Sequence, residues 1–129
     1  TGWRKQKRVI LLKAMSYHWI KIFDNEAAMH NNLMLGKPQS MVIKGNKICV
    51  ARTNEGVYAV ADRCPHNGAS LSQGQCTEKG EIVCPMHRYP FDLKTGRTTS
   101  GLTMNVLTYP IKIEENGVFV GVKAKWWEL

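Results

Sequence analysis

Short apolar runs separated by polar turn signals fill most of the chain. Met41–Ile43, Lys47–Arg52 and Val57–Val60 follow one another at a spacing of roughly 8–10 residues, with Gly-containing turns between them. Asn116-Gly117 is a strong hairpin signal between two further runs. This pattern predicts an all-β fold of antiparallel strands, in one domain, with two inserted loops that build a site.

The other expected elements surround these strands. Asp24–Met29 offers a helix N-cap followed by helix formers, which predicts one short helical turn. The remaining predicted strands are His18–Phe23, Glu81–Cys84, Phe91–Gly96, Val106–Glu114 and Val118–Val122.

Charge divides the chain into two parts. The net charge is +8 over 129 residues, and the segment 1–14 contains five basic residues and no acidic one. We therefore expect a basic N-terminal extension, residues 1–15, and a compact domain, residues 16–129. A solvated tail is favoured over nucleic-acid contact, because no basic stripe with interleaved aromatic residues occurs elsewhere. No run approaches the roughly 20 apolar residues that span a bilayer.

Two matched pairs of cysteine and histidine carry the chemistry. Cys64-Pro65-His66 and Cys84-Pro85-Met86-His87 each place a thiolate and an imidazole on one tight loop. Both donor types bind iron and zinc, and proline stiffens each turn. Cys64, His66, Cys84 and His87 are therefore the candidate metal ligands. The other two cysteines are predicted to be non-ligands, and the lack of a secretion signal favours reducing cytoplasm.

Three kinds of metal site compete at this stage. Structural zinc sites usually pair Cys with Cys and His with His along the chain, unlike the mixed pairs here. Nothing else in the sequence favours haem or catalytic zinc. A [2Fe–2S] cluster with two Cys on one iron and two His on the other needs one Cys and one His from each loop.

Cys64–Ala69 and Cys84–His87, followed by Phe91-Asp92 and Thr95-Gly96, resemble the two-loop motif of Rieske [2Fe–2S] proteins. The segments are most similar to those of small, soluble Rieske-type ferredoxins. The resemblance implies stacked antiparallel β-sheets with a small cluster-binding subdomain. It also implies that Cys64 and Cys84 hold a buried iron, and that His66 and His87 hold an outer iron beside solvent.

Several positions depart from the high-potential branch of that family. Ala69 and Met86 replace the cysteines of its loop-tying disulfide, whereas Tyr89 and Phe91 replace the Ser and Tyr that donate to the cluster. Phe91 cannot donate, and the Tyr89 hydroxyl, on a much longer side chain, is not expected to repeat the serine bond. Loss of these donors disfavours the reduced state, so we expect a potential near the lower end of the Rieske range of about −150 to +300 mV. Arg88 occupies a position where the family often has Gly, and its charge would oppose this effect.

The resemblance implies a one-electron carrier that passes electrons from a flavoprotein reductase to an oxygenase or another terminal acceptor. We expect no catalytic activity from the chain alone. One alternative is a small Rieske subunit of an oxygenase or a nitrite-reductase-like complex. The other is a zinc-bound structural or interaction module.

Overall fold

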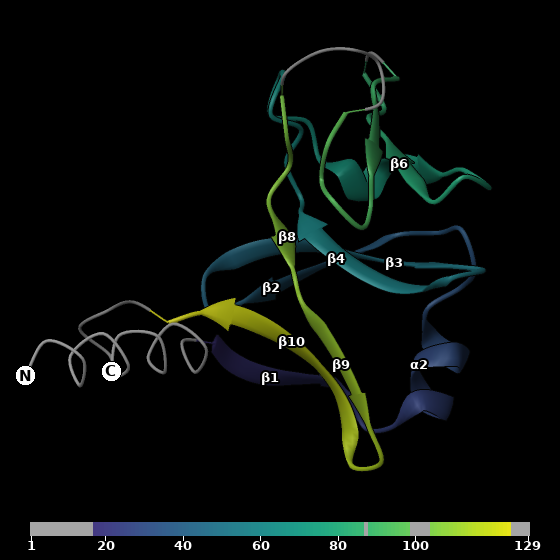
Figure 1. The fold of residues 1–129 in the computed structure, drawn as a ribbon, viewed down its shortest axis with the longest axis vertical. Helices are drawn as coiled ribbons and strands as arrows, with labels where there is room; N and C mark the ends of the chain where they lie inside the picture. Colours follow the sequence, from purple (N-terminus) through teal and green to yellow (C-terminus); the bar gives the residue numbers. More distant parts are fainter. Residues whose placement is uncertain (1–16, 87, 99–103, 125–129) are drawn as a thin grey trace, which may run out of the picture.

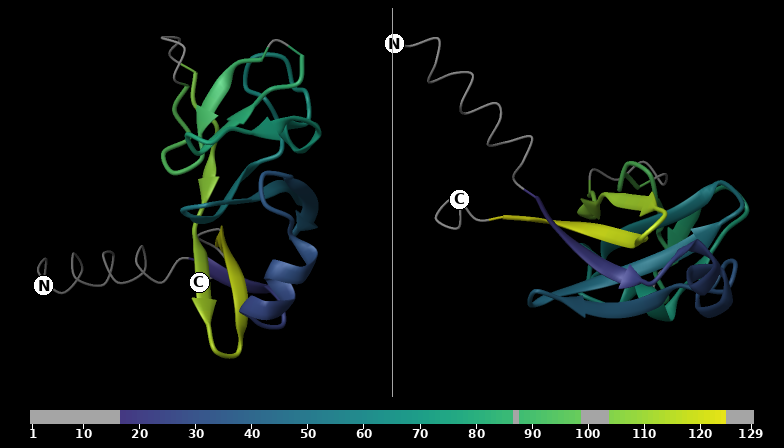
Figure 2. Two further views of the ribbon diagram at one scale, coloured as in Figure 1. Left: turned by 90° about the vertical axis from the view of Figure 1, so that its right-hand side faces the viewer. Right: turned by 90° about the horizontal axis from the view of Figure 1, so that it is seen from below.

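The computed structural model describes residues 17–86, 88–98 and 104–124. The predicted extension, residues 1–15, and the candidate ligand His87 lie outside this part of the chain. Within it the fold is all-β, as predicted, with one α-helix and three antiparallel sheets (Figures 1 and 2). None of its helices has the length and apolar character needed to cross a membrane.

The described elements follow one another along the chain as β1 (Tyr17–Phe23), α2 (Glu26–Asn32), β2 (Gln39–Ile43), β3 (Asn46–Thr53), β4 (Gly56–Ala61), the 3₁₀ turn η1 (Leu71–Gln73), β5 (Gln75–Cys76), β6 (Glu81–Val83), β7 (Pro90–Asp92), β8 (Thr108–Tyr109), β9 (Ile111–Glu114) and β10 (Gly117–Lys123). The sheets have the orders β1-β10-β9, β2-β3-β4-β8 and β5-β6-β7. The first two sheets and α2 form what we call the base, and the third belongs to a smaller subdomain.

The helix in the base is longer than the predicted turn. Its N-cap is Asn25, whose side-chain oxygen accepts the Ala28 N–H at 2.8 Å and so satisfies one of the free donors of the first turn. Met29 is the buried residue of α2 and packs into the core of the base. The helix thereby covers one end of that core (Figure 1).

The predicted strand Val106–Glu114 is wrong in one respect, because it is two strands in two different sheets. Pro110 separates β8 from β9, since proline has no N–H to continue a ladder. Its carbonyl instead accepts the Gly121 N–H at 2.8 Å. As a result β8 pairs with β4, whereas β9 pairs with β10.

The central strands β3 and β4 of the sheet β2-β3-β4-β8 have buried side chains on both faces. Along β3, Ile48 and Val50 enter the core of the base, whereas the intervening Cys49 and Ala51 enter a second core inside the subdomain. Successive side chains of a strand point to opposite faces, so one strand supplies both cores. This accounts for the unbroken apolar run of β3, and it attaches the subdomain to the base by packing.

The subdomain, residues 62–107, is inserted between two neighbouring strands. The chain leaves the base at the end of β4 and returns along β8, which pairs with β4 through Ala59↔Tyr109 and Val60↔Thr108. The two connections, after β4 and before β8, therefore lie side by side (Figure 1), and we call this junction the neck. This long-range pairing fixes where the subdomain stands on the base.

A buried carboxylate fastens the neck to the subdomain. Asp62 follows β4 and is 2% exposed. It accepts the backbone N–H and the hydroxyl of Ser72 in η1, both at 2.7 Å, and the ammonium of Lys47 lies 3.9 Å away. Burial by itself raises the pKa of Asp62, but the bonds from Ser72 and Ser40 and the charge of Lys47 outweigh it and lower that pKa.

Asp62→Ala should lower the free energy of unfolding at pH 7 by about 1–3 kcal/mol, because the Ser72 donors lose their buried acceptor. A carboxyl whose pKa is lowered in the folded state stabilises the fold above its unfolded pKa of about 3.9, and this contribution is lost as the pH falls through the folded value. The difference between wild type and variant should therefore shrink from pH 7 to pH 3 in urea-unfolding measurements. The exposed Asp24→Ala is the control, and an equal difference at both pH values would contradict the role of the Asp62 charge.

Candidate metal centre

The two Cys-Pro loops lie at the end of the subdomain that is remote from the base. Loop 1 is residues 64–69 and follows β4, and loop 2 is residues 84–89 and follows β6. They are 20 positions apart along the sequence, and the sheet β5-β6-β7 returns the chain so that they stand beside each other. We call the surface formed by the two loops the tip.

The loops share one backbone hydrogen-bond pattern. In loop 1 the Cys64 N–H donates to the Ala69 carbonyl at 2.7 Å, and the Cys64 carbonyl accepts the Gly68 N–H at 2.8 Å. In loop 2 the Cys84 N–H donates to the Tyr89 carbonyl at 3.0 Å, and the Cys84 carbonyl accepts the Arg88 N–H at 2.9 Å. Each cysteine thus has both its backbone N–H and its carbonyl bonded within its own loop, so the two loops hold their cysteines in the same way.

Both predicted cysteine ligands are fully buried, and their side chains meet. The Cys84 thiol lies within hydrogen-bonding reach of the Cys64 sulfur, and it also donates to Asn67 Oδ1 at 3.9 Å across the loops. Burial raises the pKa of Cys64, and the neighbouring Cys84 adds to this, although the backbone N–H groups of His66 and Asn67 stabilise the thiolate. A bound metal supplies the positive charge that would deprotonate such a pair.

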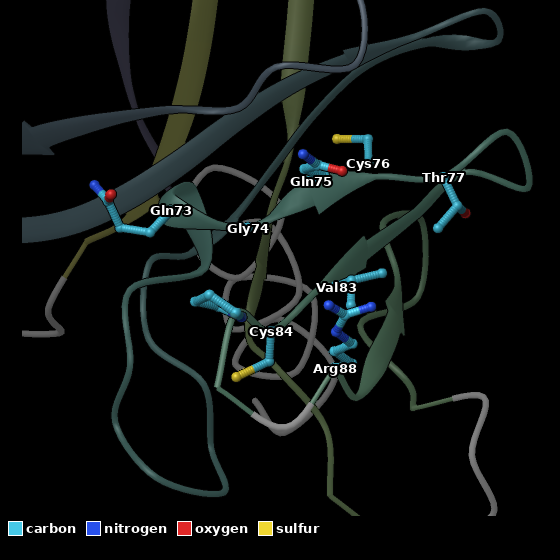
Figure 3. A pocket seen from close by; sticks show the side chains of 9 residues that line it. Gln73, Gly74, Gln75, Cys76, Thr77, Val83, Cys84 and Arg88 are labelled. Atoms are coloured by element: carbon cyan, nitrogen blue, oxygen red, sulfur yellow. The ribbon is translucent and has the colours of Figure 1, made fainter.

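The other two cysteines, which we predict to be non-ligands, lie on strands outside the two loops. Cys49 is buried in β3, and burial strongly raises the pKa of its thiol. Cys76 ends β5, and burial raises its pKa to about 11. In Figure 3 the Cys84 sulfur is directed away from Cys76. All four cysteines are free thiols.

The imidazole of loop 1 stands on the outer side of the site. His66 is exposed, and its ring packs edge-on against the ring of Tyr89 in loop 2, with centroids 4.9 Å apart. No local pattern in the sequence indicates this contact between the loops. The fourth candidate, His87, lies outside the described residues.

The donors fit an iron–sulfur group better than a hard cation. Two buried thiols lie next to each other, two backbone N–H groups point at one of the sulfurs, and an imidazole stands at the solvent edge. This places soft ligands inside and a nitrogen ligand outside, the asymmetry that a Cys₂His₂ [2Fe–2S] cluster requires. Three or more His, Cys, Asp or Glu side chains do not converge on one point within the described part of the chain.

A pocket of about 400 Å³ opens beside loop 2 (Figure 3). Its walls come from loop 2 and from the chain around β5 and β6. The residues that line it are Gln73, Gly74, Gln75, Cys76, Thr77, Val83, Cys84, Pro85 and Arg88. These residues include neither Asp nor Glu, so Arg88 is the charged side chain of the pocket wall.

Comparison with known proteins agrees with this site. Residues 23–110 match the family described as the Rieske [2Fe-2S] domain. The ferredoxin component of the naphthalene 1,2-dioxygenase system from Pseudomonas putida is 31% identical over 107 residues, which are 82% of this chain and 97% of that protein.

Solved structures show the same relationship. The ferredoxin of carbazole 1,9a-dioxygenase from Nocardioides aromaticivorans IC177 superposes with a TM-score of 0.69 at 26% identity, over 83% of this chain and 98% of that one. A chain from the complex of reduced oxygenase and oxidized ferredoxin in carbazole 1,9a-dioxygenase gives a TM-score of 0.65 at 25% identity, over 78% and 99%. With the paired loops and buried thiols described above, these matches establish that the chain belongs to the Rieske [2Fe–2S] domain family.

Proposed function

We propose that this protein is a one-electron carrier, a Rieske-type ferredoxin. The observation that carries the proposal is the pair of adjacent buried thiols, Cys64 and Cys84, with the exposed imidazole of His66 on the same closed loops. A [2Fe–2S] cluster, when bound, supplies reversible one-electron chemistry, and the protein sets its potential and access. The chain's own contribution is to bury the sulfur side of the site and leave an imidazole edge at the surface.

The proposed ligands are those that the sequence predicts. Cys64 and Cys84 would hold the inner iron, and His66 and His87 the outer one. The burial of both thiols and the exposure of His66 support this division. The identical turn pattern of the two loops supports the equivalence of the two cysteines.

The proposed partners are a flavoprotein reductase as electron donor and an oxygenase as acceptor. The Pseudomonas putida relative is named as the ferredoxin component of a dioxygenase system, and it is covered by this chain over nearly its whole length. A structural relative was solved as a ferredoxin in complex with its oxygenase. The four free cysteines are consistent with a reducing compartment, and we propose the cytoplasm.

The cluster-loaded protein should be red-brown, with absorption across the visible range and a Rieske-type EPR signal on reduction. Cys84→Ser should abolish this spectrum and His87→Cys should abolish or alter it, because each removes a proposed ligand. Cys76→Ser is the matched control and should leave the spectrum intact. A colourless protein with stoichiometric zinc would sink the carrier proposal, and bleaching by Cys76→Ser would overturn the ligand set.

The midpoint potential should lie below about +100 mV, in the lower part of the Rieske range. Phe91 is fully buried in the same apolar cluster as both thiols and has no hydroxyl to donate to sulfur. Phe91→Tyr should therefore raise the potential, because an added donor stabilises the reduced state. Tyr89→Phe should change it little. Redox titration followed by EPR measures both, and a wild-type value above about +100 mV would contradict the assignment.

A further inference from the structure

Arg88 occupies a backbone position that favours glycine. It is the fifth residue of loop 2, and the equivalent residue of loop 1 is Gly68. In each loop the N–H of this residue donates to the carbonyl of the loop's cysteine. Both residues have positive φ, 78° at Gly68 and 58° at Arg88. The left-handed region is disfavoured for a residue with a Cβ, whereas glycine enters it freely. Such a conformation at a functional site suggests that the side chain has a use.

A second guanidinium covers the equivalent position of loop 1. A Cβ placed on Gly68 would lie 3.5 Å from Arg63 Nε, so the Arg63 side chain rests against that turn. Each loop therefore carries a guanidinium at its fifth residue, once from Arg88 itself and once from Arg63. Both arginines are exposed, and neither forms an ion pair within the described residues.

The tip contains no negative charge to balance these arginines. The sequence has no Asp or Glu in residues 63–77 or 83–91. Among the acids that flank these segments, Asp62 is bonded to Ser72, Glu81 to Thr77, and Asp92 to the backbone of the following turn, whereas Glu78 is exposed next to Thr77. The tip is therefore positive independently of the basic segment at the N-terminus.

The same surface has the composition of a protein-binding site. Met86 in loop 2 is 65% exposed, and His66 in loop 1 is exposed as well. Methionine and arginine are enriched at protein interfaces. The pocket beside Arg88 adds side-chain amides and a hydroxyl from Gln73, Gln75 and Thr77, all able to donate to a carboxylate (Figure 3).

We propose that the arginine-rimmed tip, centred on Arg63, His66, Met86 and Arg88, docks redox partners whose matching surface is acidic. This rests on the proposed carrier function and adds the chemical character of the partner. Guanidinium groups bind carboxylates through paired hydrogen bonds, and opposite potentials steer the encounter. Partner carboxylates would engage Arg63 and Arg88 and bring the His66 edge against the electron donor or acceptor.

Two small oxidants of opposite charge test the sign of the surface. The reduced, cluster-loaded full chain gives one electron either to ferricyanide, which becomes ferrocyanide, or to tris(phenanthroline)cobalt(III), which becomes the cobalt(II) complex. At low ionic strength Arg63→Glu/Arg88→Glu should slow the ferricyanide reaction by roughly fivefold or more and speed the cobalt reaction. Both effects should fade at high salt. Lys123→Glu, at the end of β10 in the base, is the matched control and should change neither rate.

Two further variants separate the effect of the Arg88 charge from the effect of its backbone conformation. Arg88→Lys keeps the charge and should keep most of the ferricyanide rate. Arg88→Gly removes both the charge and the unfavourable conformation, so it should slow the ferricyanide reaction while raising Tm by several degrees. Unchanged rates in the Arg88→Gly and double Glu variants, with an intact cluster spectrum, would overturn the docking proposal but leave the carrier function standing.

A binding measurement gives a readout that needs no electron transfer. Hexacyanochromate(III) is a redox-inert, paramagnetic trianion that broadens NMR signals near which it binds. In protein labelled at methionine methyl groups, it should broaden Met86 more than Met34, which is 58% exposed in the base. The double Glu variant should abolish this preference. Equal broadening of both methyl signals in the wild type would overturn the positive docking surface.

Discussion

Burial of two central strands, β3 and β4, on both of their faces holds the base and the subdomain together. In β3 and β4 alternate side chains enter two different cores, so the sheet β2-β3-β4-β8 joins the base to the subdomain without a flexible hinge. Full burial of each aliphatic side chain contributes about 1.5–3 kcal/mol. The second core contains both thiols of the site, Cys64 and Cys84, together with Val60 of the base. Their position is therefore fixed by the same packing that fixes the subdomain.

The two loops use the same closed turn to shelter a thiol while leaving part of the site exposed. A redox group needs ligands that are held rigidly and sheltered, but it also needs an edge that a partner can approach. Closed turns at Cys64 and Cys84 direct each thiol inward, and the proline after each cysteine stays at the surface. His66 then reaches solvent from the residue after Pro65, with Tyr89 of the other loop against its ring. The loops differ at their fifth position, where one has glycine and the other arginine.

The net charge of the chain and the local charge at the tip are two different quantities. The net charge of +8 owes much to residues 1–14, which lie outside the described part. The charge that bears on the proposed partners is local, because Arg63 and Arg88 lie at the two loops and neither loop contains Asp or Glu. Charge at a docking surface controls encounter rates far more than total charge does.

The sequence by itself determined the β-class, the turns and the four candidate ligands. These features are local: apolar alternation, Gly and Asn turns, and Cys-Pro pairs whose spacing reflects the chemistry of the site. The tertiary structure decided what depends on pairing between distant segments. It divided Val106–Glu114 at Pro110 between two sheets, joined β4 to β8, and placed Asp62 against Ser72. It also set Arg63 against Gly68, a contact that no local pattern specifies because it arises only when loop 1 closes.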